Sequence, residues 1–195
     1  EQRRIASILD QVDGLVRMRE QSRQLSFDLE SRLFLDFFPE VLLPGAEFPT
    51  VPLGDIAACS SGITKGRKTS DPTSPTPYLA VSNVQDRRLD LSVVKFIDAT
   101  EAERERFQLE SGDLLLTEGG DPDKLGRGTV WRDEIAGAIH QNHIFRVRLT
   151  SPDYLPEYLS WLIASDYGKK YFLKRAKQTT GIATINQTQL RAFPV

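Results

Sequence analysis

The chain has 195 residues, enough for one ordinary domain with an added element. Its 39% hydrophobic and 27% charged residues are typical of globular proteins, and no apolar run approaches the roughly 20 residues of a membrane-spanning helix. The net charge of −2 differs from the basic balance of many nucleic-acid modules, although acidic and basic residues are segregated along the chain. A single cysteine, Cys59, excludes an internal disulfide framework, so we expect a cytoplasmic protein.

Residues 2–38 are predicted to form one long helix. Its apolar residues recur with three- and four-residue spacing, as in a coiled coil, with polar interruptions. The residues of this apolar stripe are Ile5, Ile8, Val12, Leu15, Leu25, Leu29 and Leu33. At about 1.5 Å per residue the helix spans roughly 55 Å, so we expect it to pack on a second helix. The alternative is a terminal helix folded onto its own domain.

A change of pattern follows this helix. We divide the chain into a spacer and dimerisation helix over residues 1–40, a proline-rich linker over 41–52 and a domain over 53–195. Strands are predicted at residues 51–58, 78–81, 93–97, 113–117, 128–132 and 143–149. The proline-rich stretch 69–77 is predicted to be a loop that forms no packed element.

Three shorter helices are predicted in the domain. One covers residues 100–107 with Thr100 as its cap, one opens at Pro156, and one is capped by Asp166 and runs to about Lys177. Short strands with few helices indicate an α/β (α+β) domain that follows a long helix of coiled-coil type.

The search for catalytic chemistry finds no convincing site. The glycines of residues 120–126 lack the Gly-Lys-Ser/Thr ending of a phosphate-binding loop. Asp123 and Glu134 could form the acidic pair of a metal-dependent nuclease. Such a site places a lysine two residues after one carboxylate, and Ala136 stands at that position. His140 and His143, three apart on a predicted strand, point to opposite faces and chelate a metal poorly. We therefore predict no catalytic residue and no metal site.

Basic and amide side chains gather in four segments of the domain. Arginine can read guanine, amides can read adenine, and lysine or threonine can grip phosphate. Lys170, Lys174 and Lys177, near the end of the chain, are predicted to share one helix face. The residues predicted to contact DNA are Lys65, Arg67, Lys68, Asn83, Arg87, Lys124, Arg127, Lys174, Lys177, Thr179 and Thr180.

The order of short motifs along nearly the whole chain is more specific than its composition. In the helix these are Glu1–Ala6, Leu9-Asp10, Asp13, Leu33-Phe34 and Phe37-Phe38. In the domain they are Leu53–Ile56, Ser61–Thr64, Pro77–Leu79, Ser82–Val84, Gly112–Leu115, Pro156–Leu159, Thr180-Gly181, Ile185-Asn186, Leu190 and Phe193–Val195. This combination resembles the specificity subunits of type I restriction–modification systems, with one conserved helix and one target-recognition domain.

The resemblance implies sequence-specific recognition of double-stranded DNA without catalysis by this chain. It implies methyltransferase (modification) subunits that act on adenine and a restriction subunit as partners, and S-adenosylmethionine, ATP and Mg²⁺ would belong to those subunits. A full specificity subunit has two recognition domains and two such helices. We therefore expect either a part of a longer subunit or a half-size subunit that pairs with a second copy.

Two rival functions remain open at this stage. The chain could be a protein-assembly module whose helix oligomerises without DNA readout, or a nuclease or methyltransferase with an unfamiliar site. The DNA motif does not follow from the sequence, because loop conformation decides which side chain meets which base.

Overall fold

The computed structural model describes residues 1–39, 49–122, 125–179 and 181–195, with the side chains of residues 178 and 179 excepted. The chain divides into two units, Glu1–Ala46 and Glu47–Val195. Most of the linker predicted over 41–52 lies outside the described residues.

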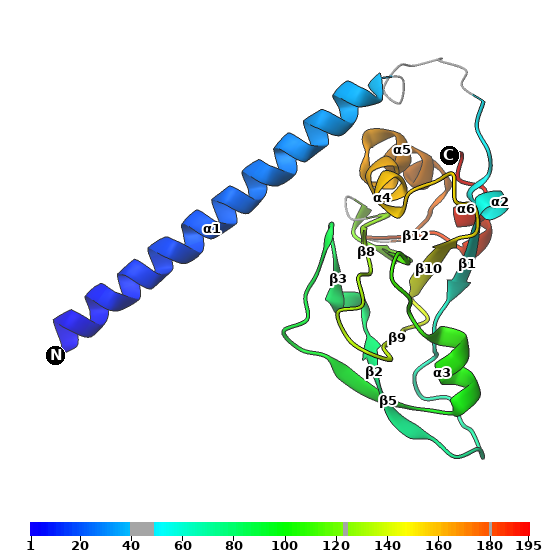
Figure 1. The fold of residues 1–195 in the computed structure, drawn as a ribbon, viewed down its shortest axis with the longest axis horizontal. Coiled ribbons are helices and arrows are strands. Elements are labelled where there is room, and N and C mark those ends of the chain that lie inside the picture. Colours follow the sequence, from blue (N-terminus) through cyan, green and yellow to red (C-terminus); the bar gives the residue numbers. More distant parts are fainter. Residues whose placement is uncertain (40–48, 123–124, 180) are drawn as a thin grey trace. The chain divides into compact units, whose positions relative to one another are not determined.

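The first unit contains helix α1 (Gln2–Phe37), which confirms the predicted long helix (Figure 1). No proline interrupts it, and its one glycine, Gly14, costs about 1 kcal/mol relative to alanine. Polar pairs one turn apart line its surface: Arg23 is ion-paired with Glu20, and the Gln24 amide donates to Asp28 at 2.9 Å. All seven residues of the apolar stripe are exposed, by 46% to 69%. Their packing on a second helix stays a prediction.

The second unit is built around a four-stranded antiparallel sheet. Its order is β1 (Ala57–Ser61), β10 (Ile144–Leu149), β6 (Leu114–Thr117) and β8 (Gly128–Val130). All four residues of β6 are buried, because strands cover both of its edges and helix α4 packs against it. Helix α4 (Pro156–Ala164) opens at Pro156 as predicted and also packs against β8 and α5 (Asp166–Arg175) (Figure 1).

A second sheet has the order β5 (Lys95–Ala99), β2 (Ser74–Leu79) and β9 (Ile139–His140). The prediction that 69–77 forms no packed element was wrong, because Ser74–Pro77 pairs with β5 and Thr76 is buried. The parallel strand β9 reaches only Tyr78 and Leu79 of β2. One edge of residues 74–77 is therefore unpaired in the sheet. Pro75 and Pro77, which lack an N–H group, cost no hydrogen bond at this edge.

Helix α3 (Glu101–Phe107) follows β5 and has the predicted cap. The Thr100 hydroxyl accepts from the Glu103 backbone N–H at 3.2 Å, and the Glu103 carboxylate accepts from the Thr100 N–H at 2.9 Å. This reciprocal capping box satisfies two N–H groups that a helix start would leave without partners.

Smaller elements complete the unit. A 3₁₀ turn (Val81–Asn83) leads into the hairpin of β3 (Val84–Gln85) and β4 (Arg88–Leu89). Strands β11 (Lys177–Thr179), β12 (Ile182–Thr184) and β7 (Gly119–Gly120) form a third sheet. Helices α2 (Leu53–Ile56) and α6 (Gln187–Arg191) pack together. Val51 and Val195 exchange backbone hydrogen bonds of 3.0 and 2.9 Å, so the two ends of this unit lie side by side.

Three boundary predictions were wrong. The strand predicted at 51–58 is broken by the helical turn α2. The cap of α5 is Ser165, whose hydroxyl accepts from the Gly168 N–H, rather than Asp166. Helix α5 ends at Arg175, because the chain turns extended at Ala176 and Lys177 pairs with Thr184 in β11. Lys177 therefore does not share a helix face with the preceding lysines.

Candidate nucleic-acid interface

The β3–β4 hairpin lies against the start of β8. The backbone N–H of Arg87 donates to the carbonyl of Gly128 at 2.8 Å. The Arg127 guanidinium donates through Nη1 to the amide oxygen of Gln85 at 3.2 Å. Two of the four predicted segments are therefore joined by direct hydrogen bonds.

A third predicted segment lies beside them. The β11–β12 hairpin pairs with β7, placing Ala183 opposite Gly120 and Thr184 opposite Gly119. The close approach depends on glycine, because a Cβ on Gly119 would lie 2.6 Å from the Thr184 side chain and 2.7 Å from the Ala183 carbonyl. Because β7 leads into the loop before β8, the pairing of β12 with β7 connects the hairpin that carries Lys177 to the segment that carries Arg127. Lys174 and Lys177 are both exposed.

Arg87 holds the tip of the β3–β4 hairpin in an unusual conformation. Its φ of 57° lies in the left-handed region, which a non-glycine residue adopts only at a cost. Its guanidinium lies over the ring of Trp161 in α4, a cation–π contact. The hairpin is thereby fixed to both α4 and β8.

The fourth segment, 61–68, attaches to a different part of the domain. Arg67 is ion-paired with Glu103 of α3 and donates to the Asp98 carbonyl at 2.8 Å. Its side chain is only 20% exposed. The acidic stretch thus neutralises Arg67, which we no longer place at DNA. Lys65 and Lys68 of the same loop are exposed.

Asn83 also leaves the set of candidate DNA contacts. It is 3% exposed, its amide nitrogen donates to the carbonyls of Asp90 and Val93 at 2.7 and 2.9 Å, and its oxygen accepts from the Ala80 N–H at 2.8 Å. A buried amide with every strong partner taken organises the 80–93 segment and has no free group for a base. Three candidates, Lys124, Thr180 and the side chain of Thr179, lie outside the described residues.

No protein-family model matches the chain. In sequence, it is 27% identical over 118 residues to the type I restriction enzyme EcoKI specificity subunit of Escherichia coli (strain K12), covering 60% of this chain and 25% of that protein. It is 22% identical over 120 residues to a putative type I restriction enzyme MjaX specificity subunit of Methanocaldococcus jannaschii, covering 61% and 28%. The chain is related to the specificity subunits of type I restriction enzymes. It spans about a quarter of the length of these relatives.

The fold agrees with this relationship. The crystal structure of the HsdS subunit from Thermoanaerobacter tengcongensis superposes with a TM-score of 0.52 at 14% identity, covering 98% of this chain and 44% of that one. A specificity-subunit fold, with a long helix and a mixed domain of sheets and helices, was the predicted fold class and is confirmed.

Three residues in or against the joined segments were missing from the predicted set. Gln85 and Arg88 stand opposite each other in the β3–β4 hairpin, and Trp161 supports Arg87. Gln85 and Arg88 lie in a segment whose polar composition already pointed to DNA. Trp161 has no such signal, because an aromatic residue in an amphipathic helix is usually part of the core.

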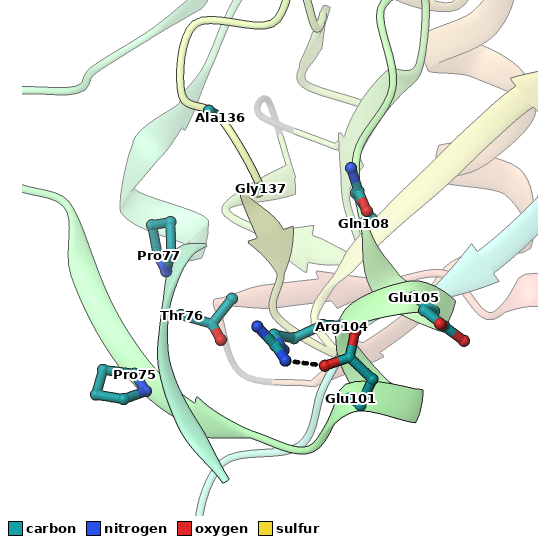
Figure 2. Close-up of a pocket in the computed structure, with 9 residues that line it drawn as sticks. All are labelled: Pro75, Thr76, Pro77, Glu101, Arg104, Glu105, Gln108, Ala136 and Gly137. Atoms are coloured by element: carbon teal, nitrogen blue, oxygen red, sulfur yellow. Dashed lines mark hydrogen bonds and ion pairs between the residues drawn. The ribbon is translucent and has the colours of Figure 1, made fainter.

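A separate polar pocket lies between β2, α3 and residues 136–137 (Figure 2). Arg104 projects into it toward Thr76 and is ion-paired with Glu101, and Glu105 adds a second carboxylate. None of the three joined segments lines it. Within the described ranges there is no cluster of three or more histidine, cysteine or acidic residues suited to a metal, and no helix there is long and apolar enough to cross a membrane.

Proposed function

We propose that this chain recognises the sequence of double-stranded DNA as part of a type I restriction–modification specificity subunit. One observation carries the proposal: a domain with the specificity-subunit fold brings the hairpin 84–89, the loop before β8 and the hairpin 177–184 together, and each contributes cationic or amide side chains. Recognition of a duplex needs this mixture, because arginine and amides read base edges while lysines hold phosphates.

The proposed contacts fall into two groups. Arg127, which a hydrogen bond to Gln85 holds in place, belongs at the base edges, and Arg87, stacked on Trp161, supports the hairpin close to them. Lysines, with their flexible stems, belong at phosphates, and Thr179 and Thr180 would hydrogen-bond to the DNA backbone. The proposed phosphate contacts are Lys65, Lys68, Lys124, Lys174 and Lys177.

The net charge of −2 is compatible with this proposal, because several carboxylates near α3 are paired with arginines of the same part of the domain. Glu103 faces Arg67, and Glu110 and Asp113 face Arg148. Salt-bridged carboxylates near α3 contribute little field at the hairpins, since their charge is compensated locally. A positive surface can therefore exist on a protein that is neutral overall.

Helix α1 would act as a spacer in the assembled protein. Its exposed apolar stripe would pack on a second helix, carried by the same protein or by a second copy of the chain. At 3.4 Å per base pair, roughly 55 Å corresponds to about 16 base pairs, which exceeds one turn of DNA and can separate two half-sites.

The proposal assigns the chemistry to other subunits. Methyltransferase subunits carrying S-adenosylmethionine would modify adenine, and a restriction subunit would use ATP and Mg²⁺. This chain would select the DNA site. It would do so in the cytoplasm, where chromosomal DNA is accessible. A protein-assembly role without DNA readout is not favoured, because the curated relatives are specificity subunits.

Methylome sequencing of the host tests the function directly. Deletion of the gene should abolish methylation at one bipartite motif, and restoring the wild-type gene should return it with the same spacing. A methylome unchanged by the deletion would refute a role in directing modification. Selection of a consensus from random duplexes by the purified protein would independently separate DNA recognition from protein assembly.

A further inference from the structure

We infer that Arg127 is a base-reading side chain, that it recognises guanine, and that Gln85 is the residue that positions it. The inference rests on the proposed DNA-recognition function and adds a specificity-determining pair to it. Arg127 donates through Nη1 to the Gln85 amide oxygen at 3.2 Å, and both residues are half-buried. Gln85 is itself anchored, because its amide nitrogen donates to the Ser82 carbonyl at 2.6 Å.

The remaining donors of Arg127 point to a ligand with paired acceptors. Its Nε is buried without a hydrogen-bond partner among the described residues, so Nη2 and the second N–H of Nη1 are the donors left for a ligand. Arg67 and Arg148 differ, since carboxylates occupy their guanidinium groups. Two parallel N–H groups match the O6 and N7 acceptors of guanine in the major groove, and that fit requires a fixed guanidinium plane.

The surroundings of the pair favour a base contact over a phosphate contact. Gln85 belongs to a two-stranded hairpin, an element that the major groove can admit. The turn of the hairpin carries Asp86, whose exposed carboxylate would repel a phosphate placed directly at the tip. Arg87, bonded to Gly128 and stacked on Trp161, keeps the hairpin rigid behind Gln85.

Complementation of the deletion strain with single variants tests the pair. Arg127→Lys keeps the charge but loses the planar fork, and Gln85→Met keeps the size but loses the acceptor. Arg132→Lys is the matched control, because Arg132 follows β8 closely and its exposed side chain pairs with Glu157 instead. The readout is the fraction of methylated sites for every single-base variant of the wild-type motif.

Arg127→Lys should relax discrimination at one G·C position by roughly 5- to 150-fold, the range expected for a lost bidentate contact, while other positions keep theirs. Gln85→Met should relax the same position by a smaller factor, as a positioning residue would. Arg132→Lys should give the wild-type motif.

An unchanged motif for Arg127→Lys would overturn the inference and leave the proposed function standing. Equal loss of methylation at all sites, with an unchanged melting temperature of the purified protein, would identify a phosphate contact and also overturn it. If Arg127→Lys lowers the melting temperature, the result for Gln85→Met is used instead. A Gln85→Met variant that keeps wild-type discrimination at every position would contradict the proposed pair. Failure of the wild-type gene to direct any motif would remove the proposed function itself.

Discussion

The guanidinium of Arg67 donates hydrogen bonds to both carboxylate oxygens of Glu103 and ties the loop between β1 and β2 to helix α3. The same side chain also donates to the carbonyl of Asp98. The Arg67 guanidinium lowers the pKa of Glu103 to about 2, assisted by the backbone N–H of Thr100. The interaction therefore stabilises the fold where Glu103 is ionised.

Arg67→Ala should lower the free energy of unfolding by about 1 kcal/mol at pH 7, measured by urea denaturation. Because the folded pKa of Glu103 lies below its usual value of 4.5, this stabilisation is complete above about pH 4.5 and is lost as the pH falls toward 2. The neighbouring variant Lys68→Ala removes an exposed charge and should leave the stability unchanged. A loss of stability in Lys68→Ala as large as that in Arg67→Ala would contradict this assignment.

This pair also shows where sequence reasoning reached its limit. The spacing of residues 61–68 suggested a cationic turn, but a carboxylate 36 positions away cannot be paired with it from sequence alone. Asn83 is a similar case, because an amide in a polar turn is as able to cap the backbone as to read a base. Local signals did predict the long helix, the Thr100 cap and the Pro156 start, since each depends on neighbouring residues.

The third sheet could not be predicted for a different reason. Its strands are two or three residues long, too short for a periodic pattern, and β7 consists of two glycines. The pairing of β7 with β12 depends on contacts between residues about 60 positions apart, such as Gly120 with Ala183. The candidate interface is thus assembled by tertiary pairing, while the residue types that it uses were visible in the sequence.

Lys177→Gln tests the phosphate contacts. Lys177 is exposed in β11, and loss of one phosphate contact should flatten the dependence of log binding constant on log salt by about 0.9. Lys95→Gln is a suitable control, because Lys95 is also an exposed strand lysine but lies in the sheet of β5, β2 and β9. Binding titrations from 50 to about 200 mM salt measure both slopes. A wild-type slope in Lys177→Gln would remove this lysine from the interface.

Substitutions in the apolar stripe test the pairing of α1. Leu29→Glu places a charge where an apolar contact with another helix is proposed, so assembly should weaken while the domain keeps its melting temperature. Gln21→Glu introduces the same charge at an exposed polar position of the same helix and should not affect assembly. Sedimentation or light scattering gives the mass of each complex. Equal masses for the two variants would show that the stripe has no part in assembly.

Because His140 is buried, we expect the free energy of unfolding to fall in mild acid. It is fully buried, its Nδ1 lies 3.1 Å from the Phe107 carbonyl, and its Nε2 has no partner among the described residues. Burial, followed by the charge of Arg146, lowers the pKa of this imidazole to about 4. His140 is therefore neutral in the folded protein at pH 5 to 7, with Nδ1 donating to the carbonyl of Phe107.

The unfolded chain binds a proton at His140 near pH 6.5, whereas the folded chain does not until about pH 4, so stability falls as the pH is lowered through this window. The full effect is of order 3 kcal/mol, and urea unfolding between pH 7 and 5 should reveal the first half of it. His140→Gln retains a donor without the titration and should flatten the slope in this range. Parallel slopes in His140→Gln and wild type would assign the acid sensitivity to other groups.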